Sequence, residues 1–286
     1  MSSPMHISAE ILAMQKAGAY TQFTLVAGDM AEEFRPGHFV AVAVGGESTG
    51  MILRRAFALS GARPGGRFAG TIQFVVAEHG PGTRWLVQRR VGEALDVVGP
   101  LGRPFPLPTR PVPAVLVGGG YGSAPLLPLA QALSDAASPV EIVLGAATAD
   151  RLYGELAAKR LAGRVTVTTD DGSAGERGVV TDVLDEVVRR VGAEVIYACG
   201  PMAMLGAVAR FAGARRIRAQ VAVEEAMACG IGVCMTCVLP VRGDDGRSRF
   251  VRSCVDGPVF DAAAVRWDDV GRLPADLVGA DAMGVR

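Results

Sequence analysis

The stretch Ala114–Leu133, AVLVGGGYGSAPLLPLAQAL, indicates the fold class of the central part of this chain. It begins with the four apolar residues of a buried strand, continues through a glycine-rich turn, and ends in helix-forming residues. Three more strand–helix pairs follow: VEIVLGAAT with DRLYGELAAKRL, RVTVTTDDGS with VVTDVLDEVVRRV, and EVIYACG with MAMLGAVARFAGAR. This alternation predicts a parallel α/β sheet with right-handed crossovers.

The flanking parts of the chain have a different rhythm. Residues 1–106 contain short β-like segments, among them TQFTLVA, HFVAVAV and TIQFVVAEHG, separated by Gly/Pro turns, which predicts a small antiparallel barrel or sandwich. The Pro- and Gly-rich segment Gly99–Pro113 indicates a domain boundary. We therefore expect an α+β multi-domain protein with a β-barrel at 1–106, an α/β domain at 107–219 and a small C-terminal part at 220–286.

Within 220–286, two strand-like pieces, TCVLPVRG and RSRFVRSCV, flank a GDDG turn. The last fifteen residues, RLPADLVGADAMGVR, have no strong pattern and are expected to form a loose tail.

The composition excludes several classes of protein. Half of the residues are hydrophobic, and 29 Lys+Arg balance 29 Asp+Glu, so the chain is neither disordered nor basic enough for a nucleic-acid binder. We find no secretory signal and no apolar run of the roughly 18 residues that a membrane helix needs. A cytoplasmic location, where thiols stay reduced, is expected.

The cysteines carry the strongest signal for a metal centre. Cys229, Cys234 and Cys237 have the spacing C-x4-C-x2-C in CGIGVCMTC, and Cys254 follows after sixteen intervening residues. Gly230 and Gly232 permit the loop to curl around a metal centre. This is the plant-type spacing of a [2Fe–2S] cluster.

Two alternatives remain for these cysteines. A structural zinc site usually has two C-x2–4-C pairs, and only one is present here. The other alternative is a set of inert buried thiols. We further expect Ile231, Val233 and Met235 to be buried neighbours that limit solvent access to the cluster, or simply core residues.

The glycine turn indicates a nucleotide site. The helix that follows the turn offers N–H groups and a positive dipole end to phosphate. The glycines of the turn would allow a ligand to approach the backbone closely. They are Gly118, Gly119, Gly120 and Gly122. The motif G-x-G-x-x-G is not met, because Ser123 takes the third position, and no acidic residue lies at the usual offset for a ribose. A tight strand–helix turn is the alternative.

Several motifs, in order along nearly the whole chain, resemble one family. They are LRRAFAL, HGPGTRWL, VVGPLGRPF, VGGGYGSAPL, TTDDGS, YACGPMAML, the cysteine cluster and SCVDGPVFDAAAVRW. Together they resemble the ferredoxin-reductase superfamily, and within it the electron-transfer subunits of NAD-dependent dihydroorotate dehydrogenases.

This resemblance implies that the barrel binds FAD and the α/β domain binds NAD. Arg55 would hold the flavin pyrophosphate, Phe57 would pack on the flavin, and Gly82 and Thr83 would bind phosphate. The other flavin-binding candidates are Ala56, Ala58, Val75, Val76 and Ala77. Cys199, Gly200 and Pro201 would lie near the nicotinamide and the flavin, with Cys199 the catalytic candidate or else a small buried residue at a strand end.

The sequence departs from the family at some positions. Ala56 and Ala58 replace a Pro and a Ser, so a hydroxyl to the flavin is missing, and Ser60 could supply one only if the strand register shifts. Relatives often carry an Arg after the second strand of the α/β domain, where this chain has Ala146 and Ala147 after Gly145. NAD is therefore favoured over NADP, and Arg151 is a possible substitute.

The resemblance implies an electron relay in pyrimidine biosynthesis. An FMN-containing catalytic subunit would oxidise dihydroorotate, and electrons would pass through the [2Fe–2S] cluster and FAD to NAD⁺, within a heterotetramer of two copies of each subunit. The alternatives are the small subunit of an NADH-dependent ferredoxin:NADP oxidoreductase or of a hydrogenase and, in another class, a non-catalytic redox sensor. His6, His38 and His79 are isolated, and no catalytic role is assigned to them.

Overall fold

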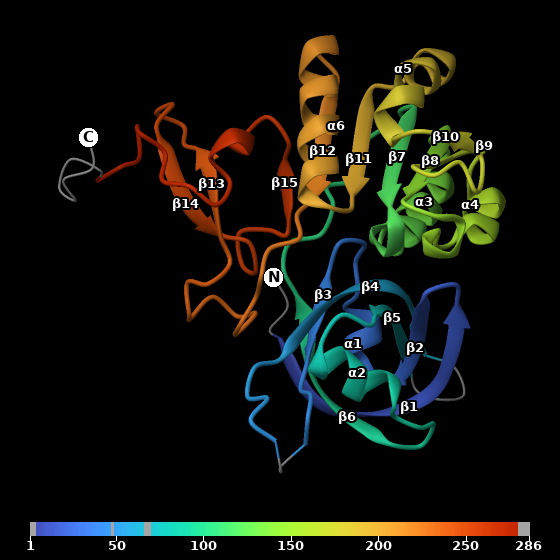
Figure 1. Ribbon diagram of the computed structural model, residues 1–286, viewed down its shortest axis with the longest axis vertical. Helices are drawn as coiled ribbons and strands as arrows, with labels where there is room; N and C mark the ends of the chain where they lie inside the picture. Colours follow the sequence, from blue (N-terminus) through green and yellow to red (C-terminus); the bar gives the residue numbers. More distant parts are fainter. Residues whose placement is uncertain (1–3, 47–48, 66–69, 280–286) are drawn as a thin grey trace.

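The first of three sheets is a closed β-barrel. The computed structural model describes residues 4–46, 49–65 and 70–279 (Figure 1). The barrel strands run in the order β1-β2-β5-β4-β3-β6, all neighbours antiparallel. Their bounds are β1 Met5–Ala17, β2 Tyr20–Val26, β3 Phe39–Val42, β4 Arg55–Arg63, β5 Thr71–Ala77 and β6 Ala94–Leu101, with helices α1 Asp29–Glu32 and α2 Pro81–Val87 between them. Closure leaves no open sheet edge, and of the two predicted architectures the barrel is confirmed.

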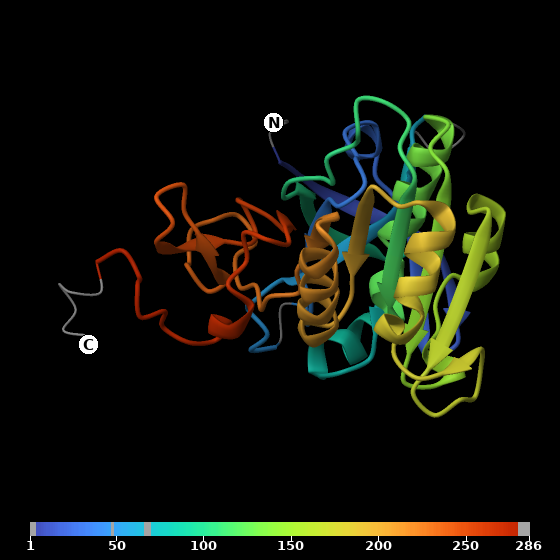
Figure 2. The same cartoon turned by 90° about the horizontal axis from the view of Figure 1, so that it is seen from above.

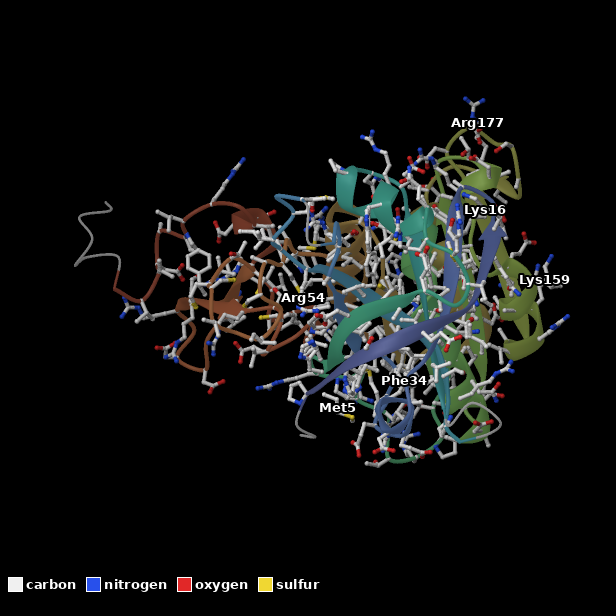
Figure 3. All side chains as sticks on the ribbon, turned by 90° about the horizontal axis from the view of Figure 1, so that it is seen from below. Met5, Lys16, Phe34, Arg54, Lys159 and Arg177 are labelled. Carbon is white, nitrogen blue, oxygen red and sulfur yellow. The ribbon has the colours of Figure 1, made fainter. Side chains whose placement is uncertain are left out.

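Apolar side chains fill the barrel. Phe23 and Phe74 stack with ring centroids 5.2 Å apart, and Phe57 stacks on Phe74 at 5.0 Å. On the outside, Arg54 forms an ion pair with Asp96 at 2.9 Å. Figure 3 shows Arg54 on the side of the barrel that faces the C-terminal part of the chain.

The second sheet has seven strands in the order β10-β9-β8-β7-β11-β12-β15. Its strands are β7 Ala114–Gly119, β8 Val140–Ala146, β9 Arg164–Thr169, β10 Glu176–Arg177, β11 Val195–Cys199, β12 Arg218–Ala222 and β15 Val259–Asp261. All pairs are parallel except β12 with β15. The strand order reverses between β7 and β11, and in such sheets ligands bind at the carboxyl ends of the strands at this switch point.

Four helices cover the two faces of this sheet. Helices α3 (Leu126–Asp135) and α4 (Glu155–Leu161) pack on one face. Helices α5 (Val180–Val191) and α6 (Met202–Arg215) pack on the other face (Figure 2). Their apolar side chains form one core cluster with those of β7 and β11. The predicted parallel α/β sheet is confirmed.

The C-terminal part forms a two-stranded ribbon beside the other two sheets (Figure 2). Strands β13 (Val238–Arg242) and β14 (Ser248–Arg252) pair antiparallel on either side of the predicted turn. Strand β12 runs across the predicted boundary at 219/220, and β15 returns to the α/β sheet, so the ribbon is attached to that domain; the domain bounds stay a prediction.

Part of the expected loose tail is ordered against the ribbon. Leu277 is buried, and the backbone N–H of Val278 donates to the Ser248 carbonyl at 3.0 Å. Residues 280–286 lie outside the described residues. In the part of the chain that the structure describes, we find no helix with the length and apolarity needed to cross a bilayer.

Candidate functional site

The loop Cys229–Cys237 forms a cradle of backbone N–H groups around one sulfur. The N–H groups of Ile231, Val233 and Cys234 point at Cys229 Sγ, with N···S distances of 3.5, 3.3 and 3.5 Å. Gly230 and Gly232 make this curl possible, because both have positive φ, 72° and 83°. Hydrogen bonds to the sulfur ligands help to set the properties of iron–sulfur clusters, so this loop fits the predicted site.

The four thiols lie in two neighbouring pairs. Hydrogen bonds from Thr236 and then from Cys229 lower the pKa of Cys234 to about 6. Burial and the adjoining Cys237 raise the pKa of Cys254 to about 12. Cys229 therefore lies beside Cys234, and Cys237 beside Cys254, so the four predicted ligands gather around one loop. Among the described residues, no three His, Cys, Asp or Glu side chains are placed to share a single metal ion.

A buried hydroxyl next to these thiols also fits a cluster. Ser253 is fully buried between two of the cysteines, since its N–H donates to the Cys237 carbonyl at 2.8 Å and Cys254 follows it. Its Oγ has no hydrogen-bond partner among the described residues. Buried hydroxyls normally have a partner, and the sulfur atoms of a cluster are acceptors that could serve.

The expected burial of the apolar loop residues is wrong. Ile231, Val233 and Met235 are 51%, 76% and 54% exposed. Because the loop turns its N–H groups inward, these side chains point outward. Barrel residues shield Cys237 and Cys254 instead, namely Phe39, Ala41 and Leu101.

A cavity of about 510 Å³ lies between the barrel and the α/β domain. Most of the predicted flavin-binding residues line it: Arg55, Ala56, Phe57, Ala58, Val75, Ala77 and Thr83, together with Gly122, Cys199 and Gly200. Val76 does not line this cavity, because alternation along β5 directs it into the barrel core, where it is 1% exposed.

The two residues predicted to bind the flavin phosphate, Gly82 and Thr83, both contact other groups of the protein, and only Thr83 lines this cavity. The Thr83 hydroxyl accepts hydrogen bonds from the N–H groups of His79 and Gly80, at 2.9 and 3.1 Å. Gly82 lies against Arg55, since a Cβ there would be 2.9 Å from Arg55 Nε. A side chain at position 82 would therefore displace the guanidinium.

The strand register does shift at Ser60. A bulge separates the pairs Leu59–Phe74 and Gly61–Gln73. However, Ser60 does not line the flavin cavity, and its Oγ is buried without a partner among the described residues. Ser60 thus does not replace the hydroxyl missing at Ala58.

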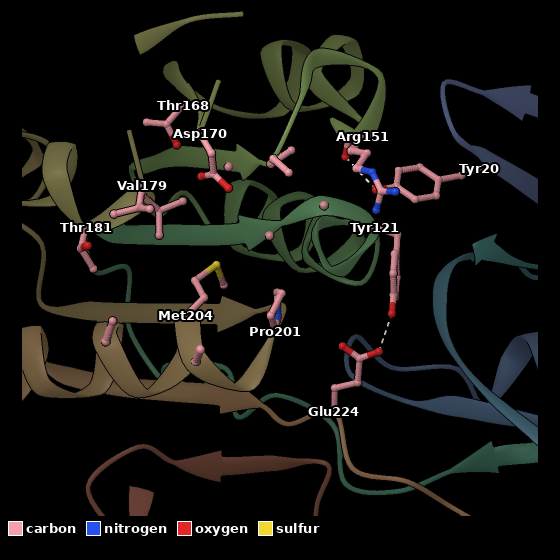
Figure 4. A pocket seen from close by; sticks show the side chains of 18 residues that line it. Tyr20, Tyr121, Arg151, Thr168, Asp170, Val179, Thr181, Pro201, Met204 and Glu224 are labelled. Atoms are coloured by element: carbon pink, nitrogen blue, oxygen red, sulfur yellow. Dashed lines mark hydrogen bonds between the residues drawn. The ribbon is translucent and has the colours of Figure 1, made fainter. Parts of the chain in front are cut away.

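A second cavity, of about 470 Å³, lies at the carboxyl ends of the parallel strands (Figure 4). Gly119, Gly120 and Pro201 line it, as do Gly145, Ala146, Ala147 and Arg151. Gly118 and Gly122 serve backbone packing instead: a Cβ would lie 2.6 Å from Ser123 Cβ in the first case and 2.6 Å from Gly200 Cα in the second. The turn therefore combines tight strand–helix packing with a ligand-accessible backbone.

Among the lining residues of this second cavity that sequence reasoning missed are four with polar side chains, Tyr20, Tyr121, Asp170 and Glu224. Asp170 directly follows β9. Its position at the end of a predicted strand, in the motif TTDDGS, could have indicated that it lies at the nucleotide site. A carboxylate here repels a phosphate on the adenosine ribose but can accept a hydrogen bond from a ribose hydroxyl. This favours NAD over NADP.

Cys199 ends β11 beside the flavin cavity. Burial, and then the nearby Glu224, raise the pKa of this thiol to about 12. Cys199 is therefore a neutral thiol near pH 7, without the thiolate that nucleophilic chemistry needs.

Two family models match the chain. One, described as the iron-sulfur cluster binding domain of dihydroorotate dehydrogenase B, matches residues 224–266, and the other, an oxidoreductase NAD-binding domain, matches residues 116–210. A dihydroorotate dehydrogenase B (NAD(+)) electron transfer subunit of Geobacillus kaustophilus is 38% identical over 84% of this chain and 90% of its own length. A probable subunit of the same name from Methanopyrus kandleri is 34% identical, over 98% of this chain and 99% of the relative.

The chain belongs to this family of electron transfer subunits. The predicted family is confirmed, and with it an oxidoreductase whose cofactors are an iron–sulfur cluster, a flavin and NAD.

Solved structures agree with this assignment. The structure of an NADH-dependent reduced ferredoxin-NADP oxidoreductase is similar with a TM-score of 0.80 and 32% identity, covering 93% of this chain and 92% of the other. The ferredoxin reductase of carbazole 1,9a-dioxygenase shares the fold with a TM-score of 0.62 at 22% identity, over 75% and 67% of the two chains. The predicted fold class is confirmed.

Proposed function

We propose that this chain passes electrons from a dihydroorotate-oxidising subunit to NAD⁺ in pyrimidine biosynthesis. The observation that carries the proposal is the continuity of the three sites. The segment Ala222–Met227 lines the flavin cavity and leads directly to Cys229, while Tyr121 and Glu224 line both cavities. A flavin bound at the central site supplies the step between single electrons and a hydride.

The residues have separate roles in this proposal. Cys229, Cys234, Cys237 and Cys254 hold the two irons. Arg55 balances the flavin pyrophosphate, and the backbone at Gly119 and Gly120 accommodates the pyrophosphate of NAD. Asp170 accepts a hydrogen bond from the adenosine ribose.

We further propose that an FMN-containing catalytic subunit docks on the cluster loop, in a cytoplasmic heterotetramer with two copies of each subunit. Ile231, Val233 and Met235 expose apolar side chains around the iron ligands. Exposed apolar clusters of this kind are typical of protein–protein contacts. A partner at this loop would bring its own redox centre close to the cluster.

A docking variant tests this surface. Val233→Glu is expected to abolish co-purification with the catalytic subunit, while leaving the visible spectrum of the isolated chain unchanged. Leu156→Glu is the matched control, because Leu156 is 68% exposed on α4. Equal loss of the partner in both variants, or in neither, would contradict docking at the loop.

A second candidate function is the small subunit of an NADH-dependent reduced ferredoxin-NADP oxidoreductase, which the similarity to that structure favours. In that function, the physiological electron donor would not be a dihydroorotate-oxidising subunit. Separate reconstitution with the two kinds of partner distinguishes them: we expect a stable complex with the dihydroorotate-oxidising subunit only. A stable complex with the other partner alone would overturn the first proposal.

NADH tests the internal relay without a partner. Under anaerobic conditions, NADH is expected to bleach the flavin absorbance of the isolated chain and to produce the electron paramagnetic resonance signal of a reduced cluster. A bleached flavin with no such signal would show that the two sites are not connected.

A further inference from the structure

Two side chains stand where the two cavities adjoin. Among the residues that the structure describes, only Tyr121 and Glu224 line both the nucleotide cavity and the flavin cavity. They come from places 103 residues apart in the chain, and the Tyr121 hydroxyl donates a hydrogen bond to Glu224 Oε1 (Figure 4). This bonded pair therefore forms the wall common to both cavities.

Several contacts hold the tyrosine ring in the wall. Its edge contacts Tyr20, with ring centroids 5.7 Å apart and planes at 75°, and His79 lies 6.3 Å away on the flavin side. Burial and the Glu224 carboxylate both raise the pKa of Tyr121, so its hydroxyl keeps the proton that it donates. The acceptor, Glu224, lies five residues before Cys229, on the segment that lines the flavin cavity.

Hydride transfer requires the nicotinamide and the flavin to be in contact, with no side chain between them. The reacting atoms of nicotinamide and flavin have to come within about 3–3.5 Å of each other. The two cavities share Tyr121 and Glu224 as lining residues, so a nicotinamide that reaches the flavin from the nucleotide cavity enters the space where these side chains lie.

We propose that the Tyr121–Glu224 pair is a movable partition, and that the nicotinamide ring displaces Tyr121 from Glu224 when it reaches the flavin. The inference rests on the assignment of the two cavities in the proposed function. The hydrogen bond is broken on nicotinamide binding, so it opposes that binding; once the ring is in place, the bond no longer affects the hydride step.

Tyr121→Phe separates these effects, because it removes the hydroxyl and keeps the ring. In the chain loaded with FAD and cluster, the rate of flavin reduction is measured by anaerobic stopped flow as a function of NADH concentration. We expect the apparent Kd for NADH to fall about tenfold, or about 1.4 kcal/mol, because no bond to a charged acceptor has to be broken. The limiting rate at saturating NADH is expected to stay within about twofold, or about 0.4 kcal/mol.

Tyr153→Phe is the matched control. The Tyr153 hydroxyl donates to Gln22 Oε1 at 2.7 Å, which is also a side-chain bond between distant parts of the chain, and Tyr153 lines neither cavity. This variant is expected to leave the Kd for NADH unchanged. Flavin content and melting temperature are compared for both variants.

The outcomes are distinct. A higher or unchanged Kd for NADH in Tyr121→Phe overturns the partition. If the flavin content of this variant also falls, the hydrogen bond is identified as a structural link between domains. Failure of the proposed function looks different, since NADH would then not reduce the flavin of the unaltered chain at all.

Discussion

At the scale of single residues, the spacing of the cysteines predicts a set of iron ligands but does not predict what surrounds them. Gly230 and Gly232 direct three N–H groups toward Cys229, and the same curl exposes Ile231, Val233 and Met235. A sequence shows that these three residues are apolar, but the side to which a loop turns them depends on positive φ angles that only the structure provides.

The first prediction concerns the iron ligands. Cys237→Ser is expected to remove the visible absorption of the cluster while the flavin spectrum remains, since Cys237 packs under the loop and not in the flavin cavity. Cys199→Ser is the control and is expected to retain both spectra. Loss of the cluster in the control, with retention in Cys237→Ser, would contradict the ligand assignment.

The second prediction concerns the choice of dinucleotide. Asp170→Ser removes the carboxylate that repels a ribose phosphate, so kcat/KM for NADPH is expected to rise about tenfold, or about 1.4 kcal/mol. Asp171→Ser is the control, because Asp171 is the adjacent acidic residue and does not line the cavity. Steady-state rates with an artificial acceptor provide the measurement. Equal gains in both variants would point to overall charge and not to Asp170.

The third prediction concerns pH. Burial, and then Arg35, lower the pKa of His38 from 6.5 to about 4. Between these values the unfolded chain binds a proton at His38 and the folded chain does not, so stability falls as pH falls through this range. From pH 7 to pH 5 the free energy of unfolding is expected to lose about 2 kcal/mol through this group.

Denaturant unfolding of the His38→Asn variant checks this effect, because the variant lacks the titrating ring. It should lose less stability than the unaltered chain over the same pH interval. Identical pH dependence of the His38→Asn variant and the unaltered chain would remove His38 as the cause.

At the scale of secondary structure, periodicity predicted the elements that bury one face. Helix α5 agrees with the predicted segment, since its buried side chains recur on one side. The segment DRLYGELAAKRL forms a shorter helix than expected, because Gly154 adopts φ 78° and α4 begins only at Glu155. Strand β15 has three residues, too few for a periodic signal, and it is defined by pairing with the distant β12.

The fourth prediction tests the packing of α5. Leu184 is fully buried among residues of β7, β11 and α6. Leu184→Ala is expected to lower the free energy of unfolding by about 2–5 kcal/mol, through lost burial and the cavity that remains. Val179→Ala is the control, because Val179 is 50% exposed just before the helix. Denaturant unfolding measures the free energy of unfolding of both variants. Equal losses of this free energy in the two variants would contradict the packing of Leu184.

At the scale of the whole molecule, motifs predicted three binding modules but not how their walls meet. The flavin cavity combines β4 of the barrel, the end of β11 and the segment before Cys229. Tyr121 lies in the glycine turn and Glu224 follows β12, 103 residues later, so their contact arises only when these two parts of the chain have packed together. No local pattern encodes such a contact.

The most direct test of the relay is NADH formation by the complex with the dihydroorotate-oxidising subunit. With dihydroorotate and NAD⁺ under anaerobic conditions, we expect one NADH for each dihydroorotate consumed, and no NADH when the chain carries Cys237→Ser, although the partner still oxidises dihydroorotate with an artificial acceptor. Undiminished NADH formation by the Cys237→Ser complex, or none by the unaltered complex, would contradict the account.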